Sequence, residues 1–254
     1  MKALITGASS GIGRDMARVL HRMGYGLILA ARRYDRLEEL KNELGGEVEI
    51  YSVDLGNKNE CVEFVDKIKD KDIDFVINNA GFGLLGEFVE TDLEKETEMI
   101  DVNITALHII TKEFLKIFDK KDKGHILNVA SSAAFLPGPL LATYYATKAY
   151  VMRLTVALGE EERKRGKKNV KLSCLCPGPV NTEFDKVANV KFSLASLSSE
   201  FVAEYAIKKA LKGKKIIIPG FGMRFLVGLQ KFLPETLLVK IAYRIQKKKT
   251  KSDN

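Results

Sequence analysis

Features that the sequence lacks exclude several classes of protein. It has only three cysteines, too few for a disulfide framework, so we expect a reducing compartment, the cytoplasm. No uncharged apolar run approaches the roughly 20 residues that a membrane-spanning helix needs, and the first residues do not resemble a secretory signal. No repeat period is visible, which argues against a solenoid.

Residues at metal-ligand spacing are also lacking. His21, His108 and His125 are scattered, and no cysteine or carboxylate stands at a matching distance along the chain. We therefore interpret the histidines as structural and expect no metal. Cys174 and Cys176 share one face of an expected strand, where burial as small hydrophobic side chains is the favoured interpretation.

The main body of the chain has only a small net positive charge. The net charge is +8, but residues 223–254 hold eight Lys or Arg and two Asp or Glu, a net of +6, which leaves +2 for residues 1–222. A nucleic-acid-binding protein more often carries a basic face across its whole fold. We therefore expect no nucleic-acid partner.

Short strand-like runs alternate with longer helix-like segments. This order is typical of right-handed crossovers and a parallel sheet covered on both faces. We predict an α/β fold, a doubly wound parallel sheet of the Rossmann type with about seven strands, in a single domain at 1–222. Strands are expected at 2–6, 26–31, 48–55, from 73, 125–132, 169–180 and 214–220, and helices from 12, at 36–44, 60–70, about 94–119, 143–166 and 199–213.

The stretch "TGASSGIG" at 6–13 joins the first expected strand to the first expected helix. Clustered glycines mark a positive φ or a close approach of the backbone to another group. A tight turn here lets backbone N–H groups face a pyrophosphate at the N-terminus of the helix. A plain tight turn is the alternative, but the position in a βαβ unit favours a dinucleotide.

The end of the second expected strand, "ILAARR", indicates which dinucleotide is bound. An acidic residue there would bond the 2′-hydroxyl of the adenosine ribose and favour NAD. The chain instead has Ala31 followed by Arg32 and Arg33, and a guanidinium suits a 2′-phosphate. We therefore predict NADP(H) as the cofactor, with NADPH preferred over NADH. Two solvated arginines at a strand end are the alternative.

Further motifs follow the later expected strands. They are "NNAG" at 78–81, Asn103 in "DVNITA", Ser131 in "NVASSAAF", Tyr144 and Lys148 in "YYATK", and "PGPVNTEF" at 177–184. Together with the glycine turn, these motifs resemble the short-chain dehydrogenase/reductase family, in its compact single-domain branch. The resemblance covers roughly residues 2–222. Each motif alone is weak, whereas the whole set in this order is specific.

Tyr144 and Lys148 stand one helical turn apart, which suits proton transfer to a carbonyl oxygen. A free tyrosine has a pKa of about 10, and the lysine charge is expected to lower it by up to ~3 units, with desolvation opposing. The resemblance implies that Tyr144 is the general acid and that Lys148 also bonds the nicotinamide ribose. It further implies that Ser131 holds the carbonyl oxygen and that Asn103 holds a water that relays protons.

The resemblance also assigns the cofactor-binding residues. It implies that Asp54 bonds the adenine edge and that Val180 and Thr182 contact the nicotinamide carboxamide. The full expected set is Gly7, Ser9, Ser10, Gly11, Ile12, Gly13, Arg32, Arg33, Asp54, Leu55, Asn79, Ala80, Gly81, Tyr144, Lys148, Pro177, Gly178, Val180 and Thr182.

The expected function is the reversible, NADPH-dependent reduction of a ketone or aldehyde to an alcohol by hydride transfer. A non-catalytic regulator that binds NADP(H) on the same fold is the alternative, which the intact tyrosine and lysine disfavour. A sugar-nucleotide epimerase or dehydratase is disfavoured by the glycine spacing.

Apolar side chains in the loops after the strands favour an apolar small-molecule substrate, although they could simply pack a closed lid. The expected lid is the loop 182–198. These side chains are Phe184, Val187, Val190, Phe192, Leu194 and Leu197 in the lid, and Phe82, Leu84, Leu85, Phe135, Leu136 and Leu140 in neighbouring loops.

Residues 223–254 are expected to form a basic amphipathic helical extension. Apolar residues such as Leu237 and Ile241 stand at helical spacing, with Lys240 and Arg244 opposite. Peripheral contact with an anionic membrane, a cover over the substrate cleft and an oligomer interface all remain open. Family members commonly assemble through their long helices, so the resemblance implies a homodimer or homotetramer.

Overall fold

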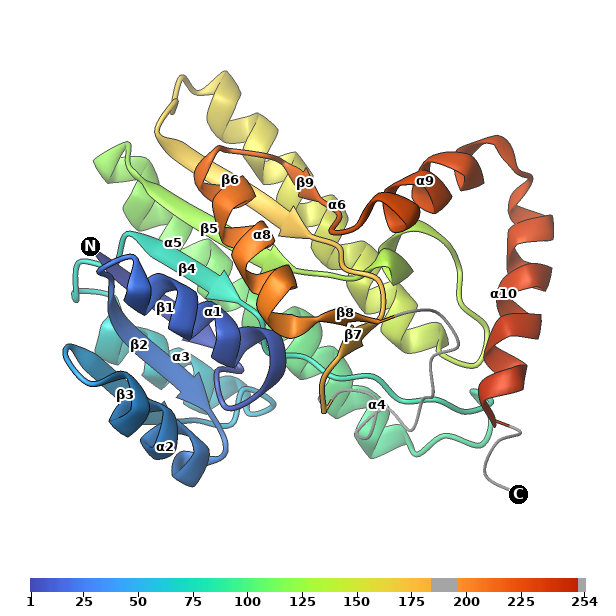
Figure 1. Ribbon diagram of the computed structural model, residues 1–254, viewed down its shortest axis with the longest axis horizontal. Coiled ribbons are helices and arrows are strands. Elements are labelled where there is room, and N and C mark those ends of the chain that lie inside the picture. The colour runs from blue at the N-terminus through green and yellow to red at the C-terminus, as the bar shows by residue number, and fades with distance from the viewer. Residues whose placement is uncertain (184–195, 251–254) are drawn as a thin grey trace.

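A computed structural model describes residues 1–183 and 196–250, and within them seven parallel strands form one sheet (Figure 1). The strand order is β3-β2-β1-β4-β5-β6-β9, so the order reverses between β1 and β4. Ligands of such sheets bind outside the carboxyl ends of the strands, at this reversal. The strands are β1 (Lys2–Thr6), β2 (Gly26–Ala31), β3 (Val48–Ser52), β4 (Phe75–Asn78), β5 (Gly124–Val129), β6 (Val170–Leu175) and β9 (Ile216–Ile217).

Helices cover both faces of the sheet, as the alternation of strands and helices predicts. One face packs against α1 (Gly11–Arg22), α2 (Tyr34–Leu44) and α8 (Ser199–Leu211). The other packs against α3 (Lys58–Ile68), α5 (Leu107–Lys121) and α6 (Ala142–Lys164). The predicted doubly wound α/β fold is therefore confirmed.

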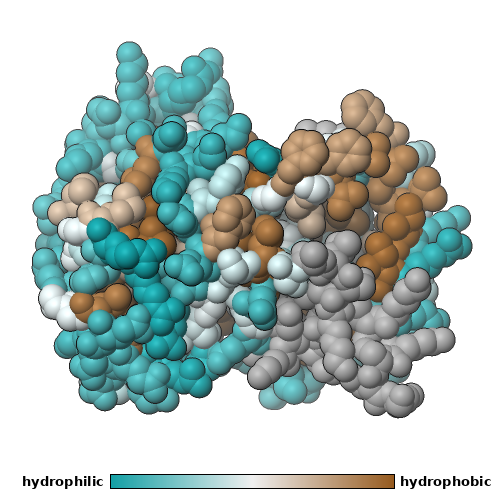
Figure 2. Space-filling model, viewed as in Figure 1, coloured by the Kyte–Doolittle hydropathy of each residue, from teal (hydrophilic) through white to brown (hydrophobic). Residues whose placement is uncertain are grey.

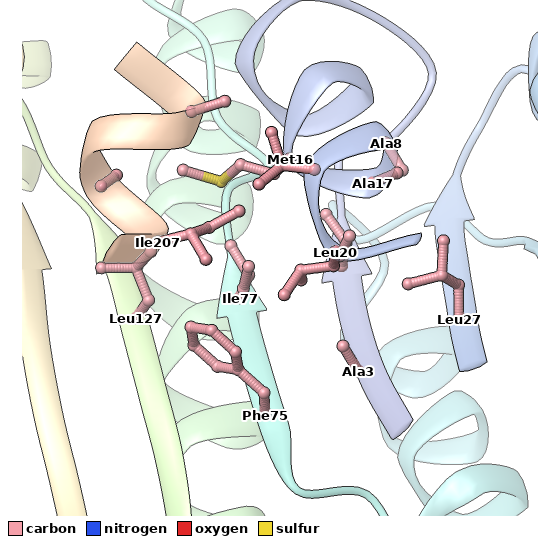
Figure 3. Packing of buried hydrophobic residues seen from close by; sticks show 14 of the residues in the cluster. Ala3, Ala8, Met16, Ala17, Leu20, Leu27, Phe75, Ile77, Leu127 and Ile207 are labelled. Carbon is pink, nitrogen blue, oxygen red and sulfur yellow. The ribbon is translucent and has the colours of Figure 1, made fainter. Parts of the chain in front are cut away.

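Side chains alternate between the two cores along each central strand. In β4, Phe75 and Ile77 pack under α1 and α8, whereas Val76 between them packs against the opposite helices (Figure 3). Successive side chains of a strand point to opposite faces, so a strand covered on both sides must be apolar throughout. All three side chains are 1% exposed or less. A shift of one residue would move each of them to the opposite face, so the register of the strand, which positions the loops of the site, is fixed.

The long helix expected at about 94–119 is not a single α-helix. It is α4 (Leu93–Ile100), a π-helical segment η1 (Asp101–Ala106) and α5. The side chain of Asn103, inside η1, is fully buried and bonds outside its own helix. Local apolar spacing does not encode such a change of winding, which is frequent at functional sites.

Several expected strands are shorter than predicted, and those expected at 48–55 and 125–132 end at Ser52 and Val129. The run 169–180 leaves the main sheet after Leu175, and β7 (Val180–Asn181) pairs instead with β8 (Leu197–Ser198). The run 214–220 contributes only the two residues of β9, because Pro219 cannot donate to a ladder and Gly220 has φ 82°. A short 3-10 helix, η2 (Ser132–Phe135), follows β5.

The chain after β9 forms an extension that we call the C-terminal arm, residues 221–250. It consists of α9 (Phe221–Leu229), η3 (Gln230–Phe232) and α10 (Glu235–Thr250), and it stands to one side of the sheet (Figure 1). Its anchoring side chains are Val227, Ala242 and Gln246, each 6% exposed or less. Across the described ranges 1–183 and 196–250, no helix is long and apolar enough to cross a membrane.

Candidate active site

The glycine turn after β1 is tightly packed against the loop after β4. Gly7 has φ 64°, and a Cβ there would lie 2.8 Å from the Cα of Ala80. A Cβ on Gly13 would lie 2.5 Å from the carbonyl oxygen of Gly7. Both positions therefore require glycine for backbone packing, which brings the start of α1 close to the strand ends.

Hydrogen bonds from Asn79 and Thr6 hold this turn in place. The Asn79 side-chain amide donates to the carbonyl oxygens of Thr6 and Gly7, both at 3.1 Å. The Thr6 hydroxyl accepts from the backbone N–H groups of Asn79 and Ala80, at 3.0 and 3.1 Å. Asn79, expected to line the cofactor, thus uses its amide to shape the cradle.

The N-terminus of α1 faces Thr182. Gly11 has φ 53°, and a Cβ there would lie 3.1 Å from a side-chain carbon of Thr182. Ser10 caps the helix by backbone position, and within the described chain its side chain makes no cap hydrogen bond and the first turn carries no acid. The positive end of the helix dipole is therefore not neutralised locally, which suits an anion.

The two arginines after β2 differ in what they contact. Arg33 donates to the hydroxyls of Ser9 and Ser10 at 3.2 and 2.9 Å, and it pairs with Glu183 at 2.9 Å. Arg32 instead pairs with Glu98 at 2.8 Å. Only Arg33 is thus tied to the glycine turn, and Arg32, although predicted with equal weight, points to α4.

Tyr144 is buried beside Ser131. Ser131 follows β5 by two residues and caps η2, where its hydroxyl also accepts the backbone N–H of Ala133 at 3.1 Å. Burial raises the pKa of Tyr144 well above its usual value, and the hydrogen bond with Ser131 opposes this rise. The expected lowering of this pKa by Lys148 is therefore wrong here, because desolvation of the phenolate is the largest effect on Tyr144.

Lys148 follows Tyr144 by one turn of α6 and is 4% exposed. Its ammonium nitrogen donates to the carbonyl oxygen of Val129 at 3.0 Å and lies 5.8 Å from the centre of the Tyr144 ring. Burial lowers the pKa of Lys148 to about 8. A Cβ on Gly81 would lie 3.0 Å from this nitrogen, so glycine keeps the space beside it open.

Asn103 connects the π-helical segment to the loop after β4 and to α6. Its amide oxygen accepts the backbone N–H of Phe82 at 3.1 Å, and its nitrogen donates to the Phe82 carbonyl at 2.9 Å. The same nitrogen donates to the Thr147 hydroxyl at 3.0 Å, which in turn donates to the carbonyl of Tyr144 at 2.7 Å. The four predicted catalytic residues therefore lie in one cluster, in which Asn103, Tyr144 and Lys148 are buried and Ser131 is half-buried.

Some predicted cofactor residues turn their side chains into the core. Leu55 and Val180 are 6% and 7% exposed and belong to core clusters on opposite faces of the sheet. Ile12 packs against the same core as Val180. The side chains of Leu55 and Val180 are therefore largely inaccessible to a ligand, whereas that of Ile12 is half-buried. The Asp54 carboxylate accepts the N–H of Gly56 at 2.9 Å and orders that loop.

The apolar residues expected around the substrate are divided between two places. Phe82, Leu84 and Leu85 pack against the cluster that contains Tyr144. Leu197 packs into the main core instead of facing a cleft. The expected lid residues Phe184, Val187, Val190, Phe192 and Leu194 lie outside the described part of the chain.

A model of the short chain dehydrogenase family matches residues 1–191. The chain belongs to this family. Mouse estradiol 17-beta-dehydrogenase 11 is 30% identical over 250 residues, which are 96% of this chain and 84% of that protein. The predicted family is therefore confirmed, and the chain is an oxidoreductase of the short-chain dehydrogenase/reductase type.

Solved structures of relatives agree with the fold, and some were solved with NADPH and others with NAD. A Sphingobium yanoikuyae short-chain dehydrogenase in complex with NADPH has a TM-score of 0.81 and 28% identity, covering 92% of this chain and 96% of that one. A Burkholderia phymatum relative in complex with NAD has a TM-score of 0.81 and 25% identity, covering 90% and 92%. Likeness to these relatives leaves both cofactors open for this short-chain dehydrogenase.

Four residues contribute to the site without having been predicted to do so. Thr6 and Thr147 hold the backbone of predicted residues, and both lie inside motifs that the sequence already marks. Glu183 pairs with Arg33, and Gln246 of the arm donates to the Tyr145 hydroxyl at 2.7 Å. Those last two contacts span 150 and 101 residues, so no local pattern could reveal them.

Proposed function

We propose that this short-chain dehydrogenase is an NADPH-dependent carbonyl reductase that acts on apolar ketones or aldehydes. The observation that carries the proposal is the cluster of Ser131, Tyr144, Lys148 and Asn103 at the carboxyl ends of the strands. Buried polar side chains must be compensated by hydrogen bonds, and these four gather at the edge of the sheet where ligands of such folds bind.

The residues of the glycine turn fit a nicotinamide dinucleotide. Side chains at Gly7 and Gly13 would collide with backbone, and the α1 N-terminus beyond Ser10 offers backbone N–H groups to a pyrophosphate. Gly81 lets the loop after β4 approach Lys148, the residue that would bond the nicotinamide ribose. When bound, the cofactor supplies the hydride, and the protein orients it and supplies the proton.

Tyr144 is the proposed proton donor to the carbonyl oxygen. Because burial raises its pKa, the phenol stays protonated at neutral pH and is ready to donate. The same burial makes the phenolate costly, so the proton that Tyr144 gives to the forming alcohol must be replaced promptly. Ser131, hydrogen-bonded to Tyr144, would hold the carbonyl oxygen and stabilise the charge that develops there.

Lys148 and Asn103 are proposed to return the proton to Tyr144. Lys148, with a pKa of about 8, can exchange a proton near neutral pH. The amide of Asn103 is committed to Phe82 and Thr147, so its main-chain oxygen in the π-helical turn is the atom that would hold a relay water. This refines the water-binding role that the resemblance implies.

The preference for NADPH rests on Arg33. Its guanidinium lies within hydrogen-bond distance of Ser9 and Ser10 and is opposed by a single carboxylate, that of Glu183. Arg36 lies 3.8 Å from the same carboxylate. A 2′-phosphate that displaces Glu183 would meet two guanidinium groups, whereas a ribose hydroxyl would gain much less.

An apolar substrate is supported by Phe82, Leu84 and Leu85, which pack around Tyr144. The estradiol dehydrogenase among the relatives also bears the name of an apolar substrate. We further propose a homo-oligomer in the cytoplasm. The helices expected to assemble are α5 and α6, and a groove between them is lined by side chains that include His108 and Arg165. In the described chain all three cysteines are buried and free of disulfides, which supports a reducing compartment.

The test is oxidation of NADPH and, separately, NADH by the purified protein with aliphatic, aromatic and β-keto ester ketones. Tyr144→Phe should lower kcat by ~10²–10⁴-fold and leave the dissociation constant of NADPH unchanged. Tyr145→Phe is the matched control and should stay active. NADPH that binds without turnover of any ketone would favour a non-catalytic NADP(H)-binding protein, and a preference for NADH would contradict the role of Arg33.

A further inference from the structure

For its length, the C-terminal arm exposes far more large apolar side chains than the rest of the described chain. Of the nineteen large hydrophobic residues exposed in the described chain, nine lie in the arm, and Phe232 and Phe221 are 85% and 78% exposed. Figure 2 shows apolar surface gathered over α9 and α10. The nine are Phe221, Phe225, Leu226, Leu229, Phe232, Leu233, Leu237, Ile241 and Ile245. Exposed patches of this kind mark interaction sites.

The apolar residues follow the helical repeat and therefore form continuous stripes. In α10, Leu237, Ile241 and Ile245 recur every four residues and are 44%, 39% and 47% exposed. The buried residues of the same helix, Ala242 and Gln246, stand one position further on and face the protein. The apolar stripe of α10 is thus not the face that anchors it, which is the reverse of ordinary amphipathic packing.

A basic stripe runs along the other side of the apolar one. Lys240, Arg244 and Lys247 are exposed. Lys240 directly precedes Ile241, Arg244 directly precedes Ile245, and Lys247 follows Ile245 by two positions. Residues 221–250 hold seven Lys or Arg and a single acid. The arm therefore presents three faces in order around α10, which are packed, apolar and basic.

We propose that the C-terminal arm is a docking surface for an anionic phospholipid bilayer. The apolar stripe would enter the boundary between headgroups and acyl chains, and the basic stripe would lie among anionic headgroups. Since no described helix can span a membrane, the contact is peripheral. A second copy of this chain fits less well, because protein interfaces are depleted in lysine at their centres and two basic arms repel.

The contact would orient the rest of the molecule. Gln246 ties α10 to Tyr145, which neighbours Tyr144 at 6.1 Å between ring centres. Gly178, in the loop after β6, approaches the arm closely, since a Cβ there would lie 2.5 Å from the side-chain methyl of Met223. Docking of the arm would therefore turn the Tyr144 side of the protein toward the bilayer. The docking itself does not depend on the proposed reaction.

The experiment is flotation of the full chain with vesicles of phosphatidylcholine alone and of phosphatidylcholine mixed with phosphatidylglycerol, at low and high salt. We expect binding to the anionic vesicles only, and its loss at high salt. Lys240→Glu with Arg244→Glu should lower the bound fraction at least tenfold, and Phe225→Ser with Phe232→Ser should lower it severalfold. Thermal unfolding checks that each variant is folded.

Two controls carry matched changes outside the arm. Lys208→Glu with Lys212→Glu makes the same charge change at the end of α8, and Val62→Ser removes an exposed apolar side chain from α3. Both should bind like the unmodified chain. Absence of binding to anionic vesicles, or equal loss in the controls, overturns the proposal. So does a fall in oligomer mass, measured by light scattering, in the arm variants while their vesicle binding persists, because the arm would then be an interface between copies.

Discussion

The two ends of this chain use apolar residues in opposite ways. In strands β1, β2 and β4 every apolar side chain is buried, and Ile5, Leu29 and Ile77 are completely inaccessible. In the C-terminal arm, residues of the same chemistry are mostly exposed, and only Val227 and Ala242 among the apolar ones are buried. The first region is organised around its own core, whereas the second has a large apolar surface left over.

The difference shows what each region is built to contact. At the glycine turn the backbone itself forms the contact surface. Packing there is so tight that even a Cβ atom would not fit at Gly7 or Gly13. In the arm, a Cβ added at Gly222 or Gly228 would meet nothing within 4 Å. A small ligand needs the first kind of precision. A broad, deformable partner such as a bilayer does not.

Alanine substitutions at these glycines should change the free energy of unfolding in opposite directions in the two regions. Gly13→Ala places a Cβ 2.5 Å from the Gly7 carbonyl, so we expect a loss of about 3 kcal/mol in the free energy of unfolding and loss of NADPH binding. Gly228→Ala, in open space within α9, should instead stabilise by up to about 1 kcal/mol. Urea unfolding and fluorescence titration measure both. A tolerated Gly13→Ala would contradict the tight cradle.

Lys148 should make stability depend on pH in an unusual direction. Its pKa in the folded chain is about 8, below the ordinary value of 10.5, so the unfolded chain binds more protons between these values. The stability of the unmodified chain relative to Lys148→Met should therefore rise from pH 8 to 10.5, by up to about 3 kcal/mol. Below pH 8 the difference should be constant.

The control for this titration is Lys112→Met, which removes an exposed lysine from α5. Its stability relative to the unmodified chain should show no comparable rise. Denaturant unfolding of all three proteins at several pH values gives the comparison. A flat difference for Lys148→Met would mean that Lys148 is solvated in the folded protein, and that its part in the proton relay needs another explanation.

Most of the fold could be predicted from the sequence because the sheet is covered on both sides. A strand such as β2 must then be apolar throughout, and the six residues of "GLILAA" are all buried. The catalytic roles of Ser131, Tyr144 and Lys148 come from the family resemblance and stay predictions, and the structure places Ser131 after β5 and the other two in α6. These are local signals placed by a regular architecture.

The remainder depends on contacts between distant residues. The π-helical turn at Asn103 accompanies hydrogen bonds to Phe82 and Thr147, and the spacing of "DVNITA" is ordinary for an α-helix. The helices of the arm were predicted by periodicity, but the face that packs was not. An apolar stripe normally marks the buried side, whereas here Gln246, a polar residue, faces the protein.

Arg33 and Glu183 should set the cofactor preference in opposite senses. Arg33→Gln removes a charged hydrogen bond to a 2′-phosphate, worth about 1.5–3 kcal/mol, so the KM for NADPH should rise about tenfold or more while that for NADH changes little. Glu183→Gln removes the carboxylate that pairs with Arg33 and Arg36, so the KM for NADPH should fall. Arg32→Gln, which loses only Glu98, is the matched control. An equal effect of both arginine variants would sink the assignment to Arg33.

The smallest expected effect is at the joint between the two regions. Gln246→Leu keeps the volume of the side chain but removes its hydrogen bond to Tyr145, which should lower stability by about 1 kcal/mol. If the arm helps to position the Tyr144 side of the site, the KM for the ketone should rise a few-fold while the KM for NADPH stays constant. Gln230→Leu, in η3 of the same arm, makes the same exchange away from Tyr145 and should change neither. Equal changes in both KM values would show that the arm acts on the whole fold and not on the substrate side alone.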